Sequence, residues 1–466
     1  MPAWLSHIAP IVLLLVAVGI VVARMPKVDL GHSEAFKRRR VMNWLPLGLT
    51  YAFLYFGRYN LSAIVSELDK AQLLTKAQFN EIDGIGAWVY GVAFLINGPL
   101  TDRLGGRATI LIAAGASSLL NVAMALAMRA ANQDPSATAA TLREQLLVLN
   151  AANMYFQSFG AVSIVKVNAP WFHVRERGVL GGLFGILISL GLYFAYDWSL
   201  LLAKLGFAAV FYGPAIVLAI CVGMSATFVR DTPSDAGFDD FDTGDATAGQ
   251  VGTMPVREVI TRMFSQRVIW LIVAIEFCSG FLRQAVMKQY RPFAKAVGAD
   301  GSFVYQNWGM LLCVAGILGG VFAGFISDQV FQSRRGPVAS VLYAGLLAGC
   351  AAAFVLLDGP MLGWSVVFMS LCVIGVHGML SGTASMDFGG SKNAGIVTGV
   401  IDGFVYLGTG AQAFYYARAL PTGTAAKTAA AWKVWPAAML PVAVLGLALC
   451  ATIWNARPQK GTSSGH

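Results

Sequence analysis

Long apolar stretches that recur along most of the chain are the sequence feature that most limits how it can fold. Such stretches lie at 8–24, 44–65, 84–101, 108–129, 143–166, 178–200, 206–229, 268–290, 304–327, 337–357, 362–385, 394–417 and 434–454. A helix rises roughly 1.5 Å per residue, so about 20 residues cross the roughly 30 Å hydrocarbon core of a bilayer. Only 12% of the residues are charged, too few for a water-soluble globular protein of this length. The sequence therefore predicts an all-α polytopic membrane protein.

Basic residues between the apolar stretches predict the topology, because cytoplasmic loops of membrane proteins are rich in Lys and Arg. The first stretch is followed by the run Arg38–Arg40, and Met1–His7 before it contains no Lys or Arg. We therefore expect 1–40 to form a retained extra transmembrane helix, with its N-terminus outside, and a basic cytoplasmic linker. The segment 66–83 then lies outside the cell, as does the loop 288–302, which contains Lys288, Arg291 and Lys295. The tail 458–466 lies in the cytoplasm. The expected location is the cell inner (plasma) membrane.

The other twelve stretches divide into two halves that share a pattern. Gly98-Pro-Leu-Thr-Asp102 returns in weaker form as Gly324-Phe-Ile-Ser-Asp328, and the separation of these segments nearly equals that between Arg58 and Arg283. A shared separation indicates a duplicated unit. We expect two six-helix halves at 41–230 and 268–457. A flexible cytoplasmic loop joins them at 231–267, and a short tail follows at 458–466.

The loop after the second of these twelve stretches resembles the cytoplasmic loop motif of the major facilitator superfamily. The matching positions are Gly98, Leu100, Asp102, Arg103, Gly105 and Arg107, with Asp328 in the weaker copy. The resemblance implies a fold of twelve helices in two pseudosymmetric halves, here with one extra N-terminal helix. An acidic residue at a helix end that faces basic residues can hold a gate by ion pairs formed in one conformation only. A loop that serves only topology is the alternative.

Several further segments, in family order, resemble the organophosphate:phosphate antiporter family, which includes carriers of glycerol 3-phosphate and hexose phosphates. They are Gly57-Arg-Tyr-Asn60, Asn153-Met-Tyr-Phe-Gln157, Trp171–Gly178, Arg230–Gly237 and Gly395–Gly410. The family places one arginine of helix 1 and one of helix 7 on the substrate phosphate, and Arg58 and Arg283 fall at those places. The stretch at 8–24 lies outside the resemblance, and 178–200 lacks the histidine that some relatives have in helix 5.

Physical chemistry independently singles out Arg58 and Arg283, because a guanidinium at bilayer depth costs several kcal/mol without a partner. Two planar guanidinium groups facing each other across a pseudo-twofold axis suit a phosphate dianion. Internal carboxylates are the alternative partners. Glu276 lies seven residues before Arg283, and Asp402 lies within the stretch 394–417. Either could provide a counter-charge or couple transport to protons.

Residues that share a helical face with Arg58 are candidates for lining a substrate cavity. Tyr51, Tyr55 and Ser62 follow this spacing. Tyr155 and Gln157 join them from the segment that resembles the antiporter family. Helix packing is the alternative role for each of these side chains.

Exchange of a small organic phosphate for inorganic phosphate by alternating access is the function that these patterns favour. A proton-coupled organic anion transporter and a non-transporting membrane sensor of a phosphorylated ligand are the alternatives. The sequence shows no Ser/His/Asp arrangement, Walker motif or metal-ligand cluster, so we expect neither an enzyme nor a cofactor or metal site. The net charge of +9 is spread over short loops, which argues against nucleic acid. We expect a monomer whose partners are the metabolite, inorganic phosphate and membrane lipid.

Overall fold

The structure, a computed structural model, describes residues 31–133, 135–173, 187–243, 267–326 and 335–454, together with a few isolated positions. The helix predicted at 8–24 and the motif residue Asp328 lie outside these residues. The described parts contain helices and no strands. They place a helix within each of the twelve stretches predicted for the body of the protein, which confirms the all-α prediction.

The N-terminal half begins at Ser33, whose hydroxyl oxygen accepts the Phe36 backbone N–H at 3.2 Å and caps α2. A capping box of Thr75 and Gln78 starts α4 in the same way. The half contains α2 (Glu34–Ala63), α3 (Val65–Lys70), α4 (Lys76–Leu104), α5 (Gly106–Gln133), α6 (Pro135–Asn168), η1 (Ala169–Trp171), η2 (Phe194–Trp198), α8 (Ser199–Ala203) and α9 (Ala209–Phe228).

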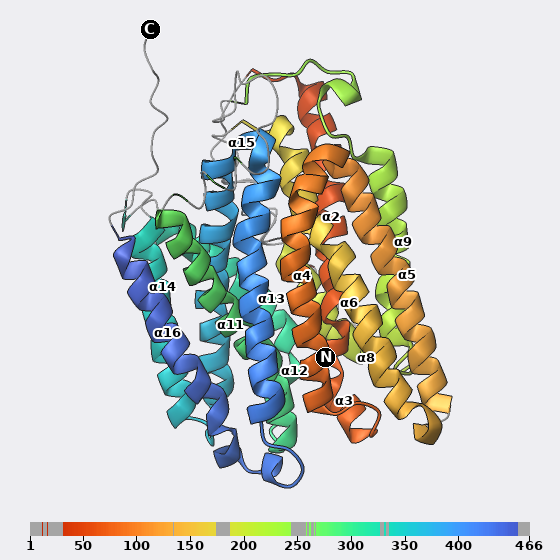
Figure 1. The fold of residues 1–466 in the computed structure, drawn as a ribbon, viewed down its shortest axis with the longest axis vertical. Coiled ribbons are helices and arrows are strands. Elements are labelled where there is room, and N and C mark those ends of the chain that lie inside the picture. The colour runs from red at the N-terminus through yellow and green to blue at the C-terminus, as the bar shows by residue number, and fades with distance from the viewer. Residues whose placement is uncertain are drawn as a thin grey trace.

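The C-terminal half contains α11 (Arg267–Ala296), α12 (Phe303–Gln306), α13 (Trp308–Phe325), α14 (Arg335–Val355), α15 (Leu362–Ala419), η5 (Ala425–Lys427), η6 (Ala429–Lys433) and α16 (Val434–Thr452). Figure 1 shows the two halves side by side, with the red to yellow-green helices on one side and the green to blue helices on the other. Among the described residues, six helices are long and apolar enough to cross a bilayer, and three shorter apolar helices accompany them.

Two of the stretches predicted as separate spans, 362–385 and 394–417, lie within the single element α15. A Cβ added at Gly363, near the start of α15, would meet the Tyr290 hydroxyl of α11 at 2.6 Å. Near the other end, the Tyr416 hydroxyl donates to the Trp435 carbonyl, and the Trp435 indole N–H donates to the Ala285 carbonyl of α11. Both ends of α15 therefore lie near the same part of α11, so the element changes direction and supplies two antiparallel spans.

One expectation about the polar segments is wrong. Lys288 and Arg291 were expected in a loop, but α11 continues to Ala296 and buries both side chains. The first part of the central loop, 231–243, packs against the N-terminal half. The Phe238 and Phe241 rings lie 5.6 and 5.7 Å from the Phe36 ring. Apolar burial therefore extends the N-terminal half beyond the end of its last span.

Glycine allows α15 to approach helices of both halves. A Cβ at Gly91 of α4 would lie 2.7 Å from the carbonyl oxygen of Gly403, and one at Gly399 would lie 2.6 Å from that of Phe94. A Cβ at Gly408 would overlap the Phe277 carbonyl of α11. Lipid provides no hydrophobic force that drives helices together, so small residues and close backbone contact stabilise such pairs. These contacts place one side of α15 against the interface between the halves.

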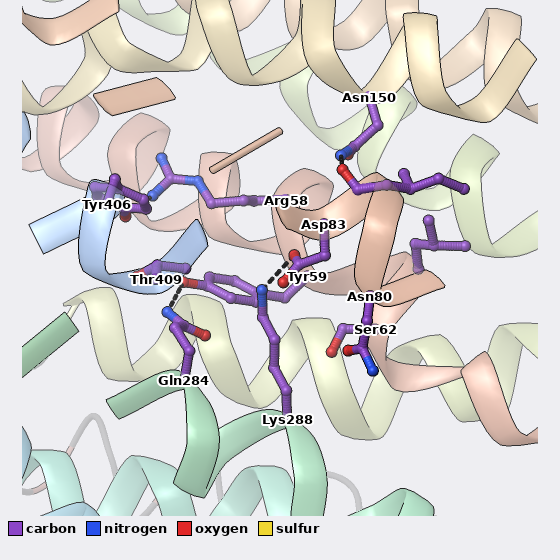
Figure 2. Close-up of polar contacts among 12 residues, drawn as sticks. Arg58, Tyr59, Ser62, Asn80, Asp83, Asn150, Gln284, Lys288, Tyr406 and Thr409 are labelled. Atoms are coloured by element: carbon purple, nitrogen blue, oxygen red, sulfur yellow. Dashed lines mark hydrogen bonds and ion pairs between the residues drawn. The ribbon is translucent and has the colours of Figure 1, made fainter. Parts of the chain in front are cut away.

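Polar contacts between the halves close one end of the bundle, the end that the sequence places outside. We call it the closed end. The Asp83 carboxylate of α4 pairs with Lys288 of α11, and the Gln284 amide donates to the Tyr59 hydroxyl of α2 at 2.9 Å (Figure 2). Gln289 and Asn80, whose amide groups are 3.2 Å apart, form another link between α11 and α4.

Asp197 provides a further contact between the halves at the closed end. It lies in the π-helical turn η2, and its carboxylate accepts the backbone N–H groups of Gly309 and Met310 in the first turn of α13, each at 3.0 Å. A Cβ at Gly309 would meet the Asp197 carboxyl carbon at 2.9 Å, so glycine is required for this approach. The helix dipole adds to the two hydrogen bonds. These bonds must break whenever the closed end opens.

Replacing Gly408 with Val should force α11 and α15 apart. Overpacking of this kind costs about 1–3 kcal/mol, so the melting temperature of the purified protein should fall by several degrees. The matched control is Gly223→Val on α9, where an added Cβ meets nothing within 4 Å. Equal melting temperatures for the two variants would show that the close approach of α11 and α15 contributes no stability.

Asp197→Asn should populate the state in which the closed end is open. The change weakens two charge-assisted hydrogen bonds, and ~1.4 kcal/mol corresponds to a tenfold shift. A cysteine at Asn80, which is 3% exposed, reports opening through labelling by a membrane-impermeant maleimide. Labelling of Asn80→Cys should be about tenfold faster when Asp197→Asn is present.

Asp300→Asn is the matched control, because the ion pair of Asp300 with Lys295 at 3.0 Å lies within one half. If both substitutions give the same labelling rate, Asp197 does not hold the halves together.

Candidate functional site

Arg58 lies on α2 and is 6% exposed. Its Nε donates to the Gln157 side-chain oxygen of α6 at 2.8 Å, and its Nη1 donates to the Tyr406 hydroxyl of α15 at 2.7 Å. The rings of Tyr55 and Tyr90 face the guanidinium carbon, each with its centroid 4.5 Å away. Neutral oxygens and aromatic faces therefore surround this cation.

Arg283 enters the same region from α11 and is 7% exposed. Its guanidinium carbon lies 5.8 Å from the centroid of the Tyr406 ring, and that of Arg58 lies 5.9 Å from the same centroid. Tyr406 thus joins the two arginines that sequence reasoning singled out. Figure 2 shows the Tyr406 side chain beside the Arg58 guanidinium group.

Unused hydrogen-bond donors distinguish this arginine pair from a purely structural network. Nη2 of Arg58, and both Nε and Nη2 of Arg283, are buried and have no hydrogen-bond partner among the described residues. A buried charged donor without a partner costs about 1–3 kcal/mol or more. An anion that accepts from these atoms would recover that energy and offset both charges.

The other cavity candidates divide into two groups. Tyr51 and Tyr55 stay close to Arg58, and their hydroxyl oxygens are 3.4 Å apart. Ser62 instead contacts the Tyr196 hydroxyl at 3.5 Å, and Figure 2 shows it displaced along α2 from the Arg58 side chain. Tyr155 packs its ring against Phe156 and Phe159 of α6. The structure therefore places Tyr51, Tyr55 and Gln157 beside the arginines. Ser62 and Tyr155 instead make packing contacts away from them.

The candidate carboxylates take different positions. Glu276 is fully buried and lies 3.2 Å from the His377 Nδ1 of α15. Among the described residues, it forms no ion pair with Arg283 within 4 Å. Asp402 is 9% exposed and lies four residues before Tyr406, on the same face of α15. Within the part of the chain that the structure describes, neither arginine is thus in direct contact with a carboxylate.

Sequence reasoning missed Tyr90, Tyr406, Lys288 and Asp83. Tyr406 falls within the segment Gly395–Gly410 that the family resemblance had marked, and its spacing from Asp402 was the available signal. The other three had no signal, since contacts between residues of different helices cannot be derived from spacing along one chain. Lys288 also lies near the arginine pair, with its Nζ 5.2 Å from the ring of Tyr59, the residue after Arg58.

The loop motif lies at the opposite end of the bundle. Asp102 pairs with Lys166 of α6 at 2.8 Å, rather than with an arginine of its own motif. The Asp231 carboxylate accepts the Arg107 backbone N–H at 2.8 Å and lies against Gly105, whose φ of +86° is available to glycine. Of the other motif residues, Gly98 lies in α4 beside Gly399, and the Arg103 side chain is exposed. The described contacts of these charged groups stay within the N-terminal half.

Comparison with known proteins gives several relatives of similar length. The chain is 24% identical to the glycerol-3-phosphate transporter of Bacillus subtilis (strain 168), covering 83% of this chain and 87% of the relative. It is 24% identical to the membrane sensor protein UhpC of Escherichia coli (strain K12), with 85% and 89% covered. The probable hexose phosphate transport protein of Chlamydia pneumoniae is 23% identical, with 93% and 94% covered.

Solved structures support the same architecture. A bacterial homolog of the human lysosomal transporter Spinster, in an inward-facing and unoccupied conformation, superposes with a TM-score of 0.65 at 12% identity. The match covers 92% of this chain and all of that chain. A sequence model of the Major Facilitator Superfamily matches residues 47–413. The chain therefore belongs to the Major Facilitator Superfamily.

Proposed function

We propose that this protein is a secondary transporter that exchanges a small organic phosphate, of the sugar phosphate or glycerol phosphate type, for inorganic phosphate. The observation that carries this proposal is the meeting of Arg58 and Arg283 at Tyr406, with buried donors left over on both guanidinium groups. Relatives named for glycerol 3-phosphate and hexose phosphate transport support the substrate class.

A phosphate group fits the charge and the hydrogen-bonding capacity of this site. Two guanidinium groups offset the two charges of a phosphate dianion, and each planar group can donate two parallel hydrogen bonds to phosphate oxygens. The tyrosines around Arg58 provide hydroxyl and aromatic contacts for the organic part of the substrate. Inorganic phosphate would use the same donors without those contacts, so one site can serve both exchange partners.

The position of the site between the halves supports transport by alternating access. Arg58 belongs to the N-terminal half, whereas Arg283 and Tyr406 belong to the C-terminal half. A ligand that binds both arginines therefore bridges the halves, and its binding energy can favour a rearrangement that the empty protein makes less readily. The contacts at the closed end are the ones that must open in that rearrangement.

Similarity to UhpC, named as a membrane sensor, supports a second candidate function. A sensor would use the same two arginines to bind a phosphorylated ligand but would carry little flux. Measurement of both binding and flux separates these functions, because a transporter must release its ligand on the other side.

Replacing either arginine with Lys should strongly reduce phosphate exchange while keeping the charge. The measurement is uptake of labelled phosphate into phosphate-loaded proteoliposomes. Lysine cannot donate two parallel hydrogen bonds, and one charge-assisted bond is worth about 1.5–3 kcal/mol, so we expect at least a tenfold loss of exchange for Arg58→Lys and Arg283→Lys. Arg418→Lys is the control, since Arg418 is exposed and its Nη1 donates to the Phe414 carbonyl of its own helix.

Normal exchange by the Arg58→Lys and Arg283→Lys variants would show that the phosphate lies elsewhere. A wild-type protein that binds phosphate without exchanging it would favour the sensor. A protein that neither binds nor exchanges phosphate would overturn the proposed substrate class.

A further inference from the structure

Glu276 and His377 form a buried pair that the phosphate site does not use. Glu276 lies on α11 with none of its side chain exposed, and its Oε2 is 3.2 Å from His377 Nδ1 on α15. Its other oxygen, Oε1, is buried and has no hydrogen-bond partner among the described residues. An isolated ionised carboxylate in an apolar interior is very costly. The charge of this pair therefore needs a physical explanation.

The separation of the two atoms determines where a proton lies. A carboxylate oxygen and an imidazole nitrogen at 3.2 Å hold a proton between them, since two lone pairs would otherwise face each other. When the imidazole is neutral and Glu276 is ionised, the pair carries one negative charge. Binding of one more proton to either residue makes the pair neutral. The pair therefore has two charge states that need little change in geometry.

His377 is the more accessible residue of the pair. Its side chain retains 23% of its surface exposed, whereas that of Glu276 retains none. The imidazole can accept a proton at one nitrogen while it holds one at the other, and its ordinary pKa lies in the physiological range. Glu276 can therefore pass a proton to His377, or receive one from it, without itself becoming exposed.

Arg283 connects the pair to the phosphate site. It lies seven residues after Glu276, two turns along the same face of α11, and the two charges interact without direct contact. Charges in a protein interior interact over such a separation more strongly than they do in water. Ionised Glu276 partly offsets the Arg283 charge and so weakens its attraction for an anion. Protonation of the pair removes this competition.

Other titratable groups also lie around the pair. The Tyr343 hydroxyl of α14 donates to the Ile275 carbonyl at 2.8 Å, and the Cys278 and Cys450 thiols are buried. Asp402 lies on α15 and interacts electrostatically with His377. When ionised, Asp402 would favour the protonated form of the pair.

We propose that Glu276 and His377 form a proton-binding site linked to Arg283, so that a proton and a phosphate group bind with positive cooperativity. The phosphate part of this inference rests on the proposed function, whereas the proton site does not. Linkage is reciprocal: protonation raises the affinity for phosphate by the same factor by which phosphate raises the affinity for the proton.

Infrared spectroscopy of the purified full-length protein tests the proton site without any substrate. The protonated carboxyl absorption should titrate between about pH 5 and about pH 8 and should be absent in Glu276→Gln. In His377→Gln, its midpoint should move by at least about one pH unit, because the hydrogen-bond partner has changed. Asp358→Asn, at an exposed carboxylate, is the control and should leave the titration unchanged. Absence of the titrating band, or an unchanged midpoint in His377→Gln, would overturn the proton site.

Binding of inorganic phosphate over the same pH range tests the linkage. Phosphate itself titrates there, but this contribution is common to all variants and cancels in the comparison. Between the alkaline and the acidic end, the affinity of the wild type should rise at least about fivefold more than that of Glu276→Gln. Identical pH profiles would overturn the linkage. A wild type that shows the titrating band but binds no phosphate would support the proton site and overturn the proposed phosphate function.

Discussion

The cost of holding two guanidinium groups inside an apolar bundle is the constraint on which the rest of this structure depends. Arg58 and Arg283 are almost fully buried, yet no carboxylate within 4 Å neutralises either of them among the described residues. The Tyr406 ring lies beside both of them, neutral oxygens accept only from Arg58 among the described contacts, and an aromatic face stabilises a cation by only ~0.5–2 kcal/mol. The site therefore keeps a net positive charge and unused donors, which is the condition for binding an anion that can later leave.

The same constraint explains why the charged groups at the closed end occur in pairs. Asp83 and Lys288 offset each other, and Asp197 is held by two backbone N–H groups of α13. Each of these contacts joins the N-terminal half to the C-terminal half, so each is lost when the halves separate there. A bundle closed only by apolar contacts could slide between many arrangements. Directional polar contacts favour one closed arrangement and make its opening a discrete step.

The proposed proton site adds a charge that changes with pH to a site whose arginine charges are fixed. Glu276 lies on the same helix as Arg283, so its protonation changes the electrostatic potential at the arginine pair without moving a helix. The arginines cannot change their own charge at any physiological pH. In our proposal, a neighbouring carboxylate and imidazole therefore provide the pH response that the anion site itself lacks.

The sequence by itself determined the fold class and the two arginines. Apolar stretches long enough for a bilayer and two arginines at matching places in duplicated halves depend only on local hydropathy and spacing. Those signals could not find Tyr406, the pairing of Glu276 with His377, or the Asp197 contact with α13. They also misassigned Lys288 and Arg291 to a loop, because their charge concealed a helix that buries them against the other half. Only the tertiary structure decided these contacts, because each joins side chains or backbone groups of helices far apart in sequence, and helical periodicity does not specify which helices are neighbours.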